Sequence, residues 1–132
     1  MKKIIIIAAI ALVVVAAAVY FLFLQPPPPA ETSYYTPGDY FVTNIKDSTR
    51  LLKVTIVLEV VSTKTEEVTE NLTENNHVIR DIILSTLRNK TEEDLRDVSS
   101  QDALRKEIVD NLKKQMGIDY LTTLFFNDFV IQ

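Results

Sequence analysis

The sequence predicts a membrane-anchored α+β protein, in which an N-terminal transmembrane helix precedes one small β-β-α-α-β domain. Three observations lead to this prediction. Residues Ile4–Leu24 form an apolar run without a single charge, residues Leu51–Val61 alternate between apolar and polar side chains, and residues 63–116 follow a helical period. This order of strands and helices indicates helices packed on one face of a small sheet.

The first element is the membrane anchor. At about 1.5 Å per residue, the run Ile4–Leu24 spans roughly 31 Å, close to the hydrocarbon thickness of about 30 Å. Lys2 and Lys3 precede the run and no basic residue follows it closely, so the positive-inside rule places residues 1–3 in the cytoplasm. The residues taken as membrane-spanning markers are Ile4, Ile10, Val15 and Leu24.

A cleaved signal peptide is the alternative interpretation of this segment. The stretch Ala16-Ala17-Ala18 offers a cleavage site of the small-residue type. The apolar run continues through six further residues after Ala18, which favours an uncleaved anchor.

A proline-rich linker is the second element, assigned to residues 25–37. The four prolines of Pro26–Pro29 cannot continue a helix and favour extended polyproline II. The linker is therefore expected to hold the domain, residues 38–132, at a fixed height above the membrane.

The domain elements follow from periodicity and capping signals. Strands are expected over Tyr40–Ile45, Leu51–Val61 and Asp119–Ile131. One helix is expected from a Thr63-x-x-Glu66 capping box to Arg88, followed by a short turn capped at Thr91 and a helix capped at Ser99 that ends at Gly117. In the last strand, simple alternation places Phe126 and Val130 on one face and Phe125, Phe129 and Ile131 on the other, with the Phe129 face buried by the helices.

The composition restricts the chemistry of the chain. The region from Gln25 onward has 12 basic and 18 acidic residues, a formal net charge of −6, which is unfavourable for binding nucleic acid. The sequence has no cysteine, and the single histidine, His77, is interpreted as a solvated helix residue. We therefore expect no catalytic, cofactor-binding or metal-binding residues and no enzyme activity.

Two candidate contact sites lie on the first helix of the domain. Glu66, Glu70 and Glu74 form an acidic stripe with i, i+4 spacing, which is either a solvated helix face or a surface for a basic partner. Leu72 and Asn76 are the positions expected near a self-association contact, because Asn75 and Asn76 interrupt the apolar face there.

Several segments, in their order along the chain, resemble the family of FliL flagellar basal-body-associated proteins. After the transmembrane helix they are Phe41–Ile45, Arg50–Glu59, Ile79–Ile83, Lys90–Leu95, Leu104–Ile108 and Phe125–Gln132. The resemblance implies a periplasmic domain similar to the stomatin/prohibitin-homology (SPFH-like) domain, in a single-pass protein of the inner membrane at the flagellar basal body. It also implies association with stator units, self-association into a ring and no catalytic residues.

The function expected from these observations is a flagellar motor accessory scaffold that supports torque and motility. Two alternatives are a stomatin-like membrane scaffold unrelated to motility and an anchored extracytoplasmic module that binds a small ligand.

Overall fold

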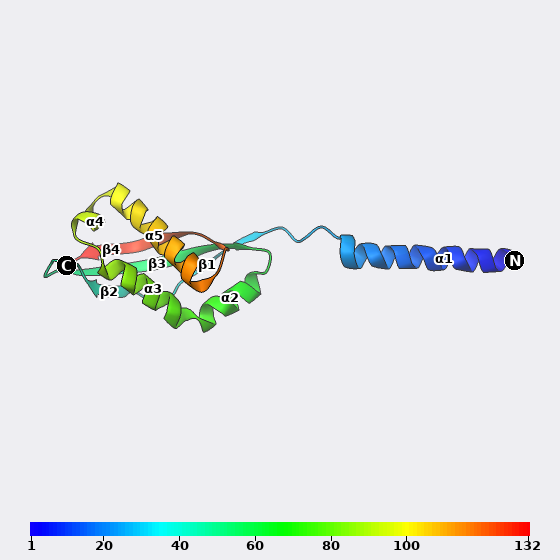
Figure 1. Ribbon diagram of the computed structural model, residues 1–132, viewed down its shortest axis with the longest axis horizontal. Coiled ribbons are helices and arrows are strands. Elements are labelled where there is room, and N and C mark those ends of the chain that lie inside the picture. Colours follow the sequence, from blue (N-terminus) through cyan, green and yellow to red (C-terminus); the bar gives the residue numbers. More distant parts are fainter.

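The computed structural model describes all residues, 1–132, and Figure 1 shows their arrangement. In chain order the elements are α1 (Lys2–Val19), the π-helix η1 (Tyr20–Leu24), β1 (Glu31–Tyr35), β2 (Phe41–Asn44), β3 (Leu51–Ser62), α2 (Thr65–Glu74), α3 (Asn76–Arg88), α4 (Glu93–Arg96), α5 (Val98–Met116) and β4 (Leu121–Ile131). The predicted α+β class with an N-terminal apolar helix is confirmed.

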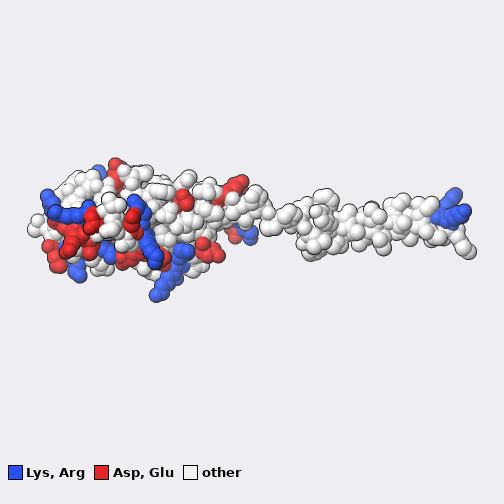
Figure 2. Space-filling model, turned by 90° about the horizontal axis from the view of Figure 1, so that it is seen from above, with Lys and Arg blue, Asp and Glu red and all other residues white.

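The apolar helix Lys2–Leu24, formed by α1 and η1, is long and apolar enough to cross a membrane. Its side chains are all exposed, including those of Ile4, Ile10, Val15 and Leu24, and the helix extends away from the domain (Figure 1). Figure 2 shows charged groups only at the N-terminal end of this helix. A fully exposed apolar rod of this length needs a hydrocarbon environment.

The extended linker is shorter than the sequence indicates. Gln25 has extended backbone angles, φ −65° and ψ 137°, and β1 begins at Glu31. The segment Glu31–Tyr35, which the sequence analysis places in the linker, therefore belongs to the sheet of the domain. Its five residues show no clear alternation, and their strand conformation depends on pairing with residues 58–62, far along the chain.

Strand β3 is the centre of an antiparallel sheet. On one side it pairs along its length with β4, and on the other side it pairs with β2 near Leu51–Val54 and with β1 near Leu58–Ser62. The helices α2, α3 and α5 cover one face of this sheet (Figure 1). Alternate β3 residues point to that face and are fully buried, namely Leu52, Val54, Ile56, Leu58 and Val60.

The predicted long helix 63–88 is broken into α2 and α3 at Asn75, whose backbone leaves the helical region at φ −99° and ψ 17°. The Asn75 side-chain amide donates to the Asn71 carbonyl at 2.9 Å, and asparagine competes with helical hydrogen bonding in this way. The Thr63 cap is wrong, since α2 begins at Thr65 and its N-cap residue, Lys64, makes no side-chain cap hydrogen bond.

The later caps are partly as predicted. Thr91 and Asp94 bond reciprocally, with the Thr91 N–H donating to the Asp94 carboxylate at 3.0 Å. Helix α5 begins at Val98, so the predicted Ser99 cap is wrong, and the Asp97 carboxylate accepts the Ser100 N–H at 2.6 Å as the actual cap. Gly117 ends α5 in the left-handed region, φ 64°, as expected.

A bulge in β4 changes the predicted faces of the last strand. Asp128 pairs with Thr55 and Phe126 pairs with Ile56, so Asn127 is an extra residue without a partner on β3. Phe126 and Phe129 consequently lie on the same helix-covered face, with ring centroids 5.2 Å apart. The predicted separation of Phe126 from Phe129 is therefore wrong. Of the three phenylalanines in β4, only Phe125 points to the open face.

Candidate interaction surfaces

Charged side chains of the domain form no candidate metal site. No group of three or more His, Asp or Glu residues lies close enough to hold an ion. His77, the single histidine, is exposed on α3. The acidic stripe on α2, the open sheet face and the groove between α5 and β4 are described below as candidate surfaces for binding a protein.

The acidic stripe on α2 is fully solvent-facing. Glu66, Glu70 and Glu74 are exposed, and none of them has a Lys or Arg within ion-pair distance in the chain. The hydroxyls of Thr69 and Thr73, on the same side of the helix, donate to carbonyls four residues earlier at 2.8 Å. This side of α2 thus presents carboxylates and threonine side chains whose hydroxyls are already bonded within the helix.

The two residues expected near a self-association contact lie inside the domain. Leu72 is 1% exposed, and Asn76 is half-buried. The Tyr35 hydroxyl donates to the Asn76 side-chain oxygen at 2.8 Å and to the Leu72 carbonyl at 3.2 Å. Burial raises the pKa of Tyr35. Leu72 and Asn76 therefore help to hold α2 and α3 against β1, with Leu72 buried and Asn76 partly exposed. Self-association near these two positions stays a prediction.

An arginine on α3 holds the turn between β1 and β2, a contact that no sequence signal indicates. The Arg80 guanidinium donates to the carbonyls of Pro37 at 2.8 Å and Tyr40 at 3.3 Å, and it lies 4.3 Å from the centre of the Phe41 ring. Gly38 has φ 133° in this turn, and a Cβ there would lie 2.3 Å from Arg80 Nη1. Tyr35 and Arg80 thus both fix the chain where it leaves β1.

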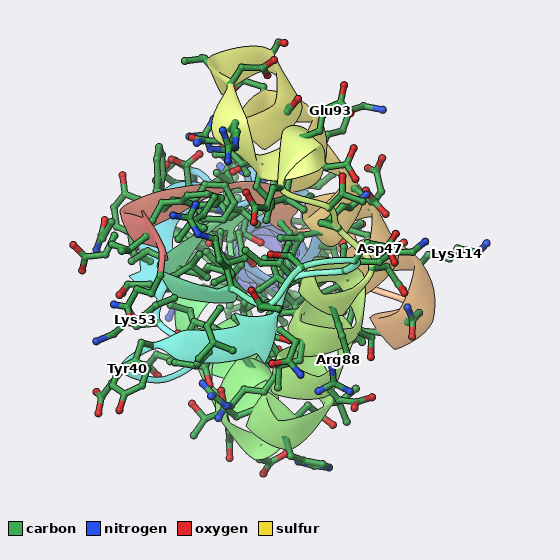
Figure 3. All side chains as sticks on the ribbon, turned by 90° about the vertical axis from the view of Figure 1, so that its left-hand side faces the viewer. Tyr40, Asp47, Lys53, Arg88, Glu93 and Lys114 are labelled. Atoms are coloured by element: carbon green, nitrogen blue, oxygen red, sulfur yellow. The ribbon has the colours of Figure 1, made fainter.

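The sheet face away from the helices is open and unusually apolar. Outside residues 1–24, seven large hydrophobic side chains are at least 40% exposed, and only Val98 lies away from this face. The Tyr34 and Phe125 rings lie 6.4 Å apart across β3, and Lys53 lies over the Tyr40 ring at 4.6 Å (Figure 3). The exposed large hydrophobics of this open sheet face are Tyr34, Tyr40, Val42, Leu51, Phe125 and Val130. Apolar groups gathered on one face are typical of a protein contact surface.

A groove lined by charged side chains of both signs, here called the α5–β4 groove, runs between α5 and the first residues of β4. Its volume is about 380 Å³, and its lining residues are Asp102, Arg105, Lys106, Val109, Asp110, Lys113, Thr122 and Thr123. Three of the domain's twelve cations thus line one side of a single helix.

An ion-pair cluster closes the end of the domain farthest from the anchor. Glu92 accepts the Ser48 hydroxyl at 2.6 Å and an Arg96 N–H at 2.6 Å, and it lies 3.7 Å from Arg50. The Ser48 and Arg96 hydrogen bonds hold the pKa of Glu92 below its usual range. This cluster connects the β2–β3 turn to α4 and has a structural role.

Comparisons with known proteins give one family and one relative. The family model described as flagellar basal body-associated protein FliL matches residues 34–132. The "Flagellar protein FliL" of Aquifex aeolicus (strain VF5) is 26% identical over 94 residues, which cover 70% of this chain and 56% of that relative. The match thus spans little more than half the length of the curated relative.

Proposed function

Because the chain belongs to the FliL family of flagellar basal body-associated proteins, we propose that it is a non-enzymatic accessory scaffold of the flagellar motor, anchored in the inner membrane, that binds stator units and supports torque. The proposed orientation places residues 1–3 in the cytoplasm and the domain in the periplasm, since Lys2 and Lys3 precede the helix. The likeness to the stomatin/prohibitin-homology domain stays a prediction.

The short tether is the observation that carries this proposal. Only Gln25–Ala30 separate the helix from β1, and extended residues of this kind cover about 3.1 Å each, or roughly 19 Å in all. The domain therefore stays close to the membrane surface, within reach of proteins that stand beside it in the same membrane. An integral motor complex such as a stator unit meets this condition.

The proposed function depends on binding to a partner protein and needs no catalytic step. The scaffold would bind the active arrangement of a stator unit more tightly than the inactive one. The ratio of these two affinities sets how far the population of stator units shifts to the active arrangement. We assign the stator contact to the open sheet face, since its exposed aromatic and aliphatic groups supply the apolar centre that protein interfaces need. We assign the acidic stripe Glu66, Glu70 and Glu74 to a basic partner surface.

Motility of complemented deletion strains tests this proposal. Replacing Phe125 and Val130, which are 42% and 43% exposed, by serine should reduce swimming while the protein level stays unchanged. The matched control is Val98→Ser, because Val98 is 76% exposed but lies away from the open sheet face. Full swimming of a strain without the gene would refute the motor function and favour a scaffold unrelated to motility.

A further inference from the structure

We propose that strand β4 binds an extended segment of a stator subunit as an additional strand of the sheet, along the edge formed by Asp128–Gln132. The partner segment carries apolar side chains at every second position and a basic side chain next to Asp128. This inference rests on the proposed function, because it names the kind of stator segment that the domain binds.

The outer edge of β4 has backbone groups without partners. Strand β4 pairs with β3 and with no other strand. Gln132 exchanges both backbone hydrogen bonds with Leu51, each at 2.8 Å. The direction of the backbone groups alternates along an antiparallel ladder, so the N–H and C=O groups of Ile131 and Phe129 point away from β3. Such a row of free donors and acceptors is a template for another extended strand rather than for a helix.

Apolar side chains are incompletely covered on both faces of this edge. On the helix-covered face, Phe129 and Ile131 are half-buried, whereas the neighbouring β3 residues Leu52 and Val54 are fully buried. The helix layer therefore ends before it covers the edge of the sheet. On the open sheet face, Val130 is 43% exposed. A strand placed against β4 would bury apolar surface on both faces, which adds to the free energy of the backbone hydrogen bonds.

The end of β4 lacks the residues that usually protect a sheet edge. Lysine and proline interrupt many exposed edge strands, and Leu121–Ile131 contains neither. The bulge at Asn127 interrupts the ladder, so the regular part of this edge is limited to Asp128–Gln132. The added strand is therefore short, and anchoring of both proteins in one membrane supports so small a contact.

An unpaired carboxylate indicates the charge of the partner segment. Asp128 is exposed and accepts a hydrogen bond from the Thr55 hydroxyl at 3.3 Å. None of the ion pairs of the chain includes Asp128. A basic side chain next to it on the added strand would supply the missing partner, because cross-strand pairs of opposite charge stabilise a sheet.

A second copy of this chain does not supply such a segment. The strands at the edges of the sheet are β1, β2 and β4. Their sequences, Glu31–Tyr35, Phe41–Asn44 and Leu121–Ile131, contain no lysine or arginine. Pairing any of them with β4 of another copy would leave Asp128 without a cation. The occupant is therefore a different protein, which under the proposed function is a stator subunit.

Removal of one outward N–H tests the contact while the pairing of β4 with β3 is kept. Ile131→Pro deletes an N–H that points away from β3, and edge strands tolerate proline at such positions. Ile131→Val is the matched control, because it keeps the N–H and an apolar branched side chain. The probes are synthetic peptides that together span the periplasmic part of the stator subunits. Their binding to the intact chain in detergent is measured by fluorescence anisotropy.

One of these peptides should bind the natural chain and Ile131→Val equally well. It should bind Ile131→Pro about tenfold more weakly, because a backbone hydrogen bond is lost and its acceptor is left unpaired. Nuclear magnetic resonance should show slower exchange of the amide hydrogens of Phe129 and Ile131 when the peptide is bound. The inference is overturned if no peptide binds, if the proline variant binds as tightly as the natural chain, or if both amides stay unprotected.

Charge reversal is a second test that does not depend on the folding of the proline variant. Asp128→Lys, a change at an exposed position, should weaken binding of the same peptide several-fold. Each basic residue of the peptide is then replaced in turn by glutamate. One of these peptides should bind Asp128→Lys more tightly than it binds the natural chain. Equal affinity of every peptide for both chains would overturn the inference.

Swimming of the variant strains separates this inference from the proposed function. Equal swimming of Ile131→Pro and Ile131→Val cells, in a strain that needs the gene to swim, overturns the edge contact and leaves the motor function standing. The expected pattern of peptide binding, in a protein whose deletion leaves swimming unchanged, supports the edge contact and overturns the motor function.

Discussion

The extra residue in β4 gives a prediction that depends directly on the sheet register. Residues Asp128 and Phe126 pair with the consecutive β3 residues Thr55 and Ile56, so Asn127 takes no place in the ladder. Deleting Asn127 should keep every other pairing and every buried side chain in place. We expect the free energy of unfolding to change by less than about 1 kcal/mol, since no core group is lost.

Deletion of Phe125 in the same strand is the matched control. Without Phe125, the pairs from Thr55–Asp128 to Leu52–Ile131 and the pair Leu58–Leu124 can all be kept only if Asn127 joins the ladder. Phe126 would then pair with Val57 and turn to the open face, and Asn127 would pair with Ile56 and enter the core. Burial of an unpaired amide costs about 1–3 kcal/mol, and loss of the half-buried Phe126 ring adds a part of the roughly 3–5 kcal/mol measured for a fully buried phenylalanine. The expected loss is at least about 3 kcal/mol, from a total of about 5–15 kcal/mol for a domain of this size.

Thermal unfolding of the intact chain in detergent, followed by the near-ultraviolet circular dichroism of its tyrosines, measures both deletions. One kcal/mol corresponds to about 4–8 °C in Tm for a domain of 60–100 residues. Removal of Asn127 should therefore lower Tm by a few degrees at most, and removal of Phe125 by more than about 12 °C. Equal losses would show that Asn127 is not an extra residue and that the assigned register is wrong.

Three further predictions concern single sites. Gly38→Ala should lower Tm, because a Cβ at φ 133° would collide with Arg80 Nη1, and the loss should shrink when Arg80 is also shortened to alanine. Asp97→Ala should lower the urea midpoint of unfolding, because the N-cap hydrogen bond of α5 is lost, whereas Ser99→Ala should lower it much less. Hydrogen bonds hold the pKa values of Asp97 and Glu92 low in the folded chain. The two carboxylates therefore stabilise the fold fully at neutral pH, and this contribution disappears as the pH falls below about 4. Unfolding curves that do not change between pH 6 and pH 3 would contradict this.

The sequence predicts those features that depend on local composition and period. The anchor follows from an uncharged run, and β3 follows from apolar residues at every second position of Leu51–Val61, with a half-polar set between them. The faces of β4 could not be predicted, because a bulge adds one residue and reverses the alternation beyond it without changing the composition. Strand β1 depends on pairing with residues 58–62, and the hydroxyl of Tyr35 at its end bonds residues of α2 and α3 about forty positions away.

The candidate surfaces also differ in whether the sequence alone predicts them. The stripe Glu66, Glu70 and Glu74 lies within one helix, so its spacing shows that the three carboxylates share a side. The α5–β4 groove and the open sheet face combine residues from distant elements, such as Lys113 with Thr122 in the groove. Sequence spacing therefore does not indicate them, and they become visible only from the packing of α5 on β4 and from the sheet register.

Co-purification of the intact protein from membranes of swimming cells tests the central claim most directly. The account predicts that stator subunits and basal-body proteins elute with the natural chain and with Val98→Ser, and that the stator subunits are depleted when Phe125 and Val130 are replaced by serine. Recovery of the natural chain without any stator or basal-body protein, under conditions that keep the motor intact, would contradict it.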